Sequence, residues 1–328
     1  MENRLGMVDL LRRHPEIEEQ PIDRPLFVVG PPRSGTTIFH DLLAMDPDNR
    51  VPLSWEASYP LPPPERATYN SDPRIARVNK DLDRVDALLP EFKTMHPMGA
   101  QRAQECVSLV AHDFTSMIYY VQFNVPTYDS WVCDNHMHSA FKWHRRYLQI
   151  LQWKCPGVRW ALKSPQHMWH LEYVHREYPD ALIVQTHRDP VKSVISMSSL
   201  ATELHRLASD KASLTRVAKH YAEGLARGYN ATVDYRKSGK LPEAQVVDLY
   251  FRDFIQDQVG TVRRAYNHFD MSLSPGAANA MQAFLDENPA DKFGKHLYQL
   301  EDTGLDMDWL RGLFTNYESY FDIPREAI

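Results

Sequence analysis

Short apolar runs alternate along this chain with longer stretches that have the apolar spacing of a helix. Each run is followed by a stretch in which apolar side chains recur three or four positions apart, the spacing of one helix face. The order strand, helix, strand, helix is typical of a parallel sheet covered by helices, because parallel neighbours need a crossover connection. We therefore predict an α/β fold of three layers, with a central parallel sheet flanked by helices. The runs that predict strands are residues 26–29, 158–162, 181–186 and 245–249.

Other segments are predicted to extend this core. Residues 1–24 are polar and form an N-terminal arm with a short helical pattern, whereas residues 50–73 hold six prolines and are expected to be mostly irregular. A long irregular segment in a compact protein is often a binding loop, so residues 50–73 are a candidate active-site segment. One domain over residues 1–328 is expected. Helices, some of them insertions, are predicted at residues 74–95, 101–123, 191–207 and 214–237.

Composition narrows the classes of function. The chain has 328 residues, with 37 Lys and Arg against 43 Asp and Glu and a net charge of -6, which argues against a uniformly basic face that binds nucleic acid. No apolar run approaches the roughly 20 residues of a membrane helix, and no secretory signal is recognised. Neither the three cysteines nor the histidines have metal-ligand spacing. We expect a cytoplasmic protein without a metal, a nucleic-acid partner or a membrane span; its oligomeric state is left open.

A glycine-bounded loop follows the first predicted strand and opens a helix. Residues 30–37 read Gly-Pro-Pro-Arg-Ser-Gly-Thr-Thr, which has the spacing of a phosphate-binding P-loop except that Thr36 stands where lysine is expected. Backbone N–H groups of such a loop converge on an anion, and the helix dipole adds to the attraction. Arg33 supplies a permanent positive charge. The pattern predicts a phosphate-like ligand, and Thr36 counts against ordinary ATP hydrolysis. A tight turn that binds nothing is the alternative.

A second candidate anion site follows the third predicted strand. Arg188 lies at the strand end, where ligands of open α/β sheets gather, and Ser196 lies eight residues later on the next predicted helix. An arginine offers a fork of donors and a serine offers a hydroxyl donor, so the pair suits a phosphate. Taken alone, this segment fits an Asp-Pro helix start with a surface arginine better than it fits a phosphate site. Because two candidate anion sites occur in one chain, we favour the interpretation that this segment binds a ligand.

Together the two sites resemble those of sulfotransferases that use 3′-phosphoadenosine 5′-phosphosulfate (PAPS), especially the bacterial-type family. In that superfamily Lys or Arg before Ser/Thr-Gly-Thr-Thr belongs to the 5′-phosphosulfate loop, and an Arg with a Ser eight residues later binds the 3′-phosphate. The resemblance implies a P-loop-like sulfotransferase fold and extends to residues 49–56, 161–167 and 294–298. The implied cofactor-binding residues are Pro32, Arg33, Ser34, Gly35, Thr36, Thr37, Arg188 and Ser196, with Phe251 near the adenine and Lys295 and His296 near the 3′-phosphate.

Sulfuryl transfer also needs a base for the acceptor proton and cations for the charge on the leaving oxygen. Glu56 is the first candidate base, by resemblance to carbohydrate-type sulfotransferases, and His167 is the second. Arg33 and Lys163 are candidates to stabilise the sulfuryl group or the leaving phosphate. The alternatives are that Glu56 caps a turn, that His167 is a structural residue and that Lys163 lies on the surface. Glu105 fits a solvated helix face better than an acceptor pocket.

The predicted activity is metal-independent transfer of a sulfuryl group from PAPS to a hydroxyl or amine of a small-molecule, lipid or carbohydrate acceptor. The other product is 3′-phosphoadenosine 5′-phosphate (PAP). A P-loop small-molecule kinase, which would consume ATP with Mg²⁺, is one alternative. A catalytically silent nucleotide-binding protein, which would bind without transfer, is another. No pattern in the sequence identifies the acceptor.

Overall fold

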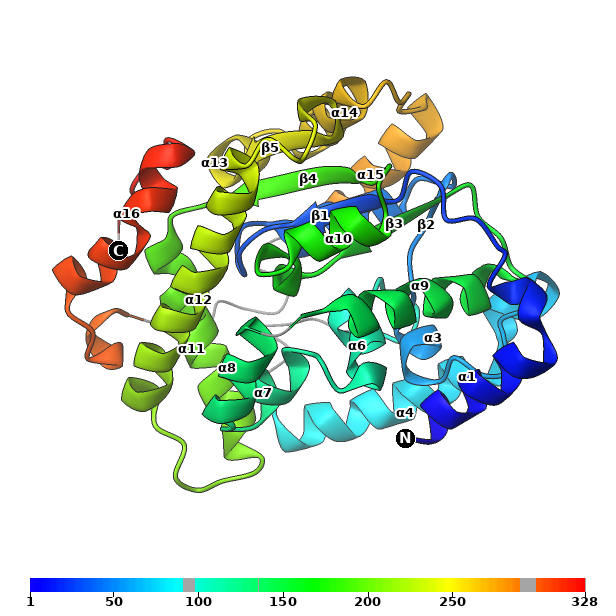
Figure 1. Ribbon diagram of the computed structural model, residues 1–328, viewed down its shortest axis with the longest axis horizontal. Coiled ribbons are helices and arrows are strands. Elements are labelled where there is room, and N and C mark those ends of the chain that lie inside the picture. The colour runs from blue at the N-terminus through cyan, green and yellow to red at the C-terminus, as the bar shows by residue number, and fades with distance from the viewer. Residues whose placement is uncertain (91–97, 135, 290–298, 328) are drawn as a thin grey trace.

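A five-stranded parallel sheet lies at the centre of the protein, in the order β2-β3-β1-β4-β5 (Figure 1). The computed structural model describes residues 1–90, 98–134, 136–289 and 299–327. The four predicted strands are confirmed, and an edge strand of two residues adds a fifth that is too short to leave a sequence pattern. The strands are β1 (Leu26–Val29), β2 (Asn49–Arg50), β3 (Arg159–Lys163), β4 (Leu182–His187) and β5 (Val246–Tyr250).

Alternating side chains of β1 divide the core between the two faces of the sheet, because successive side chains of a strand point to opposite sides. Leu26 and Val28 belong to one apolar cluster, and Phe27 and Val29 belong to the other. Helices on both sides confirm the predicted three layers. The first cluster includes side chains of α2 (Thr36–Ala44), α14 (Gln258–His268) and α15 (Pro275–Glu287), and the second includes those of α9 (His138–Gln152), α10 (Leu171–Glu177), α11 (Pro190–Arg206), α12 (Leu214–Lys237) and α16 (Met307–Tyr320).

Several predicted helices are confirmed, but the one expected over residues 101–123 is wrong. This stretch is broken at Phe114, whose φ of 56° lies in the left-handed region and cannot continue a helix. Apolar periodicity alone did not reveal that break. The pieces are α6 (Cys106–Val110), a 3₁₀ turn at Ala111–Asp113 and α7 (Ile118–Gln122), followed by α8 (Pro126–Asp134). The helix α1 (Glu2–Arg13) agrees with expectation. The helix predicted over residues 74–95 is α4 (Pro73–Leu88), which ends at Leu88, and residues 91–95 lie outside the described residues.

The Pro-rich segment is more ordered than predicted. It contains the short helix α3 (Ser54–Ser58) and a 3₁₀ stretch at Arg66–Ser71. Backbone hydrogen bonds tie its first part to residues 100–104: Ser54 N–H donates to Arg102 O over 3.0 Å, and Gln104 N–H donates to Pro52 O over 2.7 Å. The segment therefore fixes the chain that leads into α6, and α6 lies close to the end of β3.

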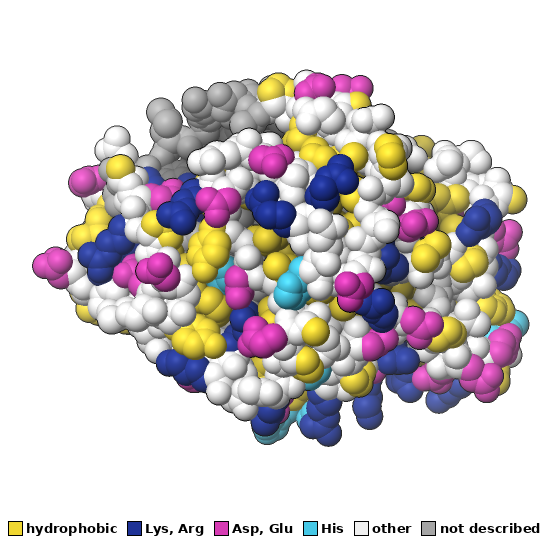
Figure 2. Space-filling view, turned by 90° about the horizontal axis from the view of Figure 1, so that it is seen from above, with side chains coloured by type: hydrophobic (Ala, Val, Ile, Leu, Met, Phe, Trp, Pro, Cys, Tyr) yellow, Lys and Arg dark blue, Asp and Glu magenta, His cyan; other side chains and the backbone are white. Residues whose placement is uncertain are grey.

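Positive and negative side chains are interspersed on the face seen in Figure 2, with no single-sign area gathered there. This agrees with the net charge of -6 and with local rather than global attraction of an anion. Among the described residues, no helix combines the length and apolarity needed to cross a membrane.

Candidate active site

The glycine-bounded loop connects β1 to α2, and side-chain contacts attach it to the next strand and its helix. Ser34 Oγ donates to Pro31 O over 2.7 Å and lies 2.6 Å from Thr186 Oγ1 on β4. Ser193 Oγ on α11 donates to Pro32 O over 2.7 Å. Buried hydrogen bonds of this kind hold the loop in one shape without a ligand, which lowers the ordering cost of binding.

Two glycines allow the loop to take this path. A Cβ on Gly30 would lie 2.0 Å from Thr186 Oγ1 and 2.8 Å from Thr186 O, so only glycine fits against β4. Gly35 has a φ of 86°, a region that L residues with side chains rarely adopt. Thr36 follows as the first residue of α2 and is buried, whereas the Arg33 side chain is exposed at the tip of the loop.

Arg188 lies at the end of β4 and contacts the loop directly. Its Nη1 donates to Arg33 O over 2.7 Å, and its guanidinium carbon lies 4.0 Å from the centre of the Phe251 ring, which begins α13 (Phe251–Phe254) after β5. The same ring lies 3.3 Å from the position a Cβ of Gly35 would take. The structure thus brings Arg33, Gly35, Arg188 and Phe251 together at one edge of the sheet.

The remaining predicted cofactor residues have different placements. Ser196 is buried on α11, one turn after Ser193, which holds the loop. Thr37 is half-buried in the first turn of α2. Lys295 and His296 lie outside the described residues. The roles of all these side chains in binding stay predictions.

Lys163 is the last residue of β3, and its buried amine points to the loop. The amine donates to Thr37 Oγ1 over 3.2 Å and forms a short ion pair with Glu105 Oε1. The Lys163 side chain is only 2% exposed, whereas that of Glu105 is 17% exposed. Lysine is therefore present beside the loop, although it comes from another strand than in a P-loop NTPase.

Glu105 was only the weaker candidate for an acceptor pocket, and the expectation that it lies on a solvated helix face is wrong. It precedes α6 at the N-cap position and faces Lys163 rather than water. Two sets of contacts hold the segment that carries Glu105 close to Lys163. Arg102 forms an ion pair with the buried Asp41 of α2, and backbone hydrogen bonds connect the segment to residues 52–54. A lone acidic residue before an apolar stretch carries no sequence signal of this contact.

Glu56, the first candidate base, lies inside the protein with a fully buried side chain. Arg50 Nη2 donates to its Oε1 over 2.7 Å. The N–H of Leu53 and the hydroxyl of Tyr69 donate to its Oε2, over 2.9 and 3.1 Å. All these contacts anchor α3 and the Pro-rich segment, so they favour a structural role for this carboxylate.

His167, the second candidate base, lies in a 3₁₀ turn (Pro165–Met168) after β3 and is also buried. Its ring meets the Phe27 ring edge-on at 5.3 Å between centroids, and neither ring nitrogen has a hydrogen-bond partner among the described residues. Burial holds the pKa of His167 well below its usual value, with nearby His144 and His170 adding to the effect. The ring packs among Phe27, Phe141 and His144 in the apolar core beside β1.

A small cavity of about 10 Å³ lies beside Pro32 of the glycine-bounded loop. Aromatic and methionine side chains form most of its wall, and the buried Asp129 adds one charge. A second hollow, between α9 and α10, holds none of the predicted site residues. The residues around the first cavity are Pro32, Met117, Tyr120, Asp129, Trp169, Met197, Tyr221, Gly224 and Leu225.

Three neighbouring strands end at cationic side chains beside a P-loop-like turn. This turn lacks the lysine of an NTPase loop, and the cations beside it come from other strands. They suit an α/β protein that binds an anionic, phosphate-like ligand. The comparison with protein families identifies the class. The model of the sulfotransferase family matches residues 25–275, so this chain belongs to the sulfotransferase family and is a sulfotransferase.

Solved structures support the assignment over nearly the whole chain. Sulfotransferase STF1 from Mycobacterium tuberculosis H37Rv is 32% identical, with 97% of this chain and 82% of that one covered and a TM-score of 0.83. Sulfotransferase STF9 from Mycobacterium avium is 28% identical, with 99% and 85% covered and a TM-score of 0.89. A search of curated proteins finds no match.

Proposed function

We propose that this sulfotransferase transfers a sulfuryl group from PAPS to a hydroxyl or amine of a small-molecule, lipid or carbohydrate acceptor. The observation that carries the proposal is the convergence of Arg33, Lys163 and Arg188 on one loop. Lys163 reaches Thr37, and Arg188 reaches the backbone of Arg33. A donor with phosphate groups at the 5′ and 3′ positions of its ribose presents two separate anions, and cations from different strand ends suit them.

The loop and Lys163 are proposed to hold the 5′-phosphosulfate. Backbone N–H groups of residues 33–37 and the N-terminus of α2 attract the anion, with the hydroxyls of Thr36 and Thr37 as further donors. The Lys163 amine, beside Thr37 at 3.2 Å, is placed to stabilise charge on the bridging oxygen. As the sulfur–oxygen bond to PAP breaks, its electron pair stays on the 5′-phosphate of PAP.

The 3′-phosphate is proposed to bind Arg188 and Ser196. The guanidinium stacks on Phe251, and such stacking with an aromatic face holds an arginine side chain in one orientation. Phe251 would then lie close to the adenine, where a ring can stack but cannot donate a hydrogen bond.

Glu105 is our proposed proton acceptor, in place of the buried Glu56 and His167. In the empty site its carboxylate pairs with Lys163. When the anionic donor attracts the lysine amine, this carboxylate is left beside the sulfuryl group and takes the acceptor's proton as the new sulfur–oxygen bond forms. Pro32, Met117 and Tyr120 line a cavity of only about 10 Å³, so side chains there must move before an acceptor can enter from this side.

Nucleotide binding tests the proposal directly. We expect titration calorimetry to show binding of PAP, and Arg188→Ala to weaken it about 10–100-fold, because each hydrogen bond to a charged group contributes about 1.5–3 kcal/mol. The matched control is Arg216→Ala, an exposed arginine on α12, which should leave the affinity within about twofold.

An absence of PAP binding by the wild-type chain would overturn the proposal. Unchanged affinity in Arg188→Ala would remove only the 3′-phosphate assignment. Consumption of ATP with Mg²⁺ would support the small-molecule kinase instead, although Thr36 occupies the position of its loop lysine.

A further inference from the structure

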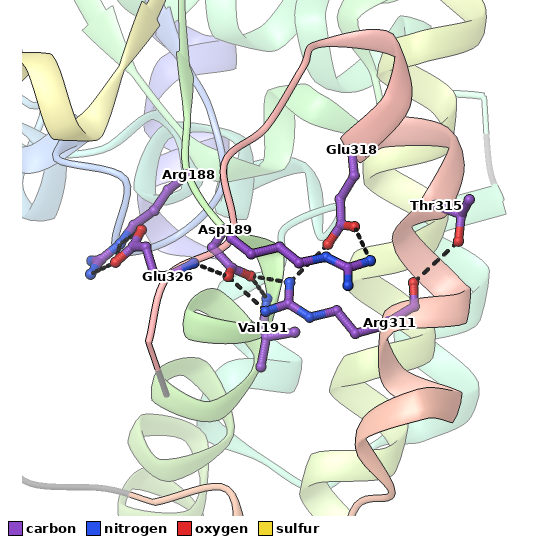
Figure 3. A network of polar contacts seen from close by, with 8 residues as sticks. Arg188, Asp189, Val191, Arg311, Thr315, Glu318 and Glu326 are labelled. Carbon is purple, nitrogen blue, oxygen red and sulfur yellow. Dashed lines mark hydrogen bonds and ion pairs between the residues drawn. The ribbon is translucent and has the colours of Figure 1, made fainter.

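The C-terminal segment of the chain lies on the arginine that we assign to the 3′-phosphate (Figure 3). Glu326 receives two hydrogen bonds from one edge of the Arg188 guanidinium: Nε donates to Oε1 and Nη2 donates to Oε2, each over 2.9 Å. This is the bidentate geometry in which an arginine binds a carboxylate or a phosphate. A phosphate oxygen pair cannot use that edge while Glu326 occupies it.

The segment is attached at a defined place. The backbone N–H of Glu326 donates over 2.8 Å to Asp189 Oδ2. The Asp189 side chain is fully buried and begins α11 by accepting the N–H of Val191. Arg311 of α16 forms two hydrogen bonds with the same carboxylate, over 2.7 and 2.8 Å (Figure 3). The backbone of the segment is therefore docked on a rigid network.

The Glu326 side chain itself is able to leave. It is 33% exposed, whereas its partner Arg188 is 16% exposed. Water reaches both partners, so solvent screens part of their attraction and the side chain can exchange with a stronger anion. A phosphate, with more charge and more acceptor oxygens, is the stronger partner for the guanidinium.

We propose that the C-terminal segment, residues 323–327, is an internal competitor of the nucleotide, with the Glu326 carboxylate in the place of the 3′-phosphate. The inference rests on the proposed function, specifically on Arg188 as the 3′-phosphate ligand. Nucleotide binding displaces the carboxylate, and the return of the carboxylate to Arg188 assists release of PAP. Apparent affinity falls in proportion to the fraction of molecules in which the site is occupied by its own chain.

The test compares two nucleotides on two variants by titration calorimetry. Glu326→Gln should bind PAP about tenfold more tightly than the wild-type chain, the gain expected if Glu326 is seated in about nine molecules of ten. Adenosine 5′-monophosphate, which lacks the 3′-phosphate, should bind both chains within about twofold. The matched control Asp322→Asn removes one negative charge from an exposed site four residues earlier and should change neither affinity.

Two further chains separate competition from simple charge repulsion. A chain shortened to end at Pro324 should reproduce the gain for PAP, and its melting temperature will show that it folds. In the Arg188→Ala background, Glu326→Gln should have no effect on the residual affinity, because the two side chains then have no shared contact. A gain in that background would overturn the proposal in favour of general repulsion.

The remaining outcomes are also decisive. Equal PAP affinity in the wild-type chain and Glu326→Gln, or equal tightening of both nucleotides, would overturn the competitor. If the wild-type chain binds PAP and Arg188→Ala weakens that binding, the proposed function stands even when the competitor fails. If no variant binds PAP, the proposed function fails, and the inference fails with it.

Discussion

Glu105→Gln is expected to lower kcat by about 10²–10⁴-fold, the range that a positioned proton acceptor contributes. The amide keeps the size of the side chain but does not accept the acceptor's proton. Affinity for PAP should stay the same or increase, because Lys163 loses the internal counter-ion that it holds in the empty site. Steady-state kinetics with a screened acceptor, together with calorimetry of PAP, separates the two effects. The acidic limb of the kcat/KM profile should also flatten.

Glu56→Gln is the matched variant for this experiment, since it makes the same change in the other carboxylate candidate. Measured at a temperature where it remains folded, it should retain most of the wild-type kcat. A large loss of kcat in Glu56→Gln with near-normal turnover in Glu105→Gln would contradict the assignment. Glu56 would then be the proton acceptor.

The second large effect is on stability. Glu56→Gln should lower the free energy of unfolding by about 3–5 kcal/mol, because it leaves the buried Arg50 charge without its carboxylate partner. Arg50 cannot escape to water: its guanidinium lies 4.3 Å from the Trp160 ring and donates to the carbonyls of Cys155 and Leu151. A loss of this size is a large share of the roughly 5–15 kcal/mol by which a domain is stable.

Urea unfolding followed by far-UV circular dichroism measures this loss. The control is Glu65→Gln in the same Pro-rich segment, where an exposed glutamate pairs with Lys154 over 2.8 Å. Exposed pairs contribute about 0–1 kcal/mol, so this variant should unfold close to the wild-type midpoint. Equal stability of the Glu56 and Glu65 variants would show that the buried ion pair does not contribute to the free energy of unfolding.

Much of the fold could be predicted because strands and long helices leave periodic patterns. The apolar run at residues 26–29 became β1, and the amphipathic stretch 214–237 became α12 with the same bounds. The stretch 101–123 had a similar pattern but formed separate pieces, since a left-handed residue at Phe114 interrupts it. Periodicity reports which side of a segment is apolar and not whether the backbone continues.

Sequence patterns predicted which candidate residues lie close together when those residues are attached to strand ends. Arg33, Lys163 and Arg188 each follow a strand, and parallel strands end at the same edge of a sheet, so the local pattern implied their proximity. Their contacts in the structure agree with that expectation. The acidic residues had no such signal, because Glu56 and Glu105 lie on segments whose path depends on distant contacts.

The sequence by itself determined the three-layer α/β architecture, the glycine-bounded loop and the cations near it, since each depends on neighbours within a few positions. Tertiary structure decided which carboxylates meet those cations. Glu105 pairs with Lys163 across 58 positions and Glu326 pairs with Arg188 across 138, whereas Glu56 is enclosed with Arg50. Pairing across such distances depends on how loops pack, and no local pattern of hydrophobic and polar residues specifies that packing.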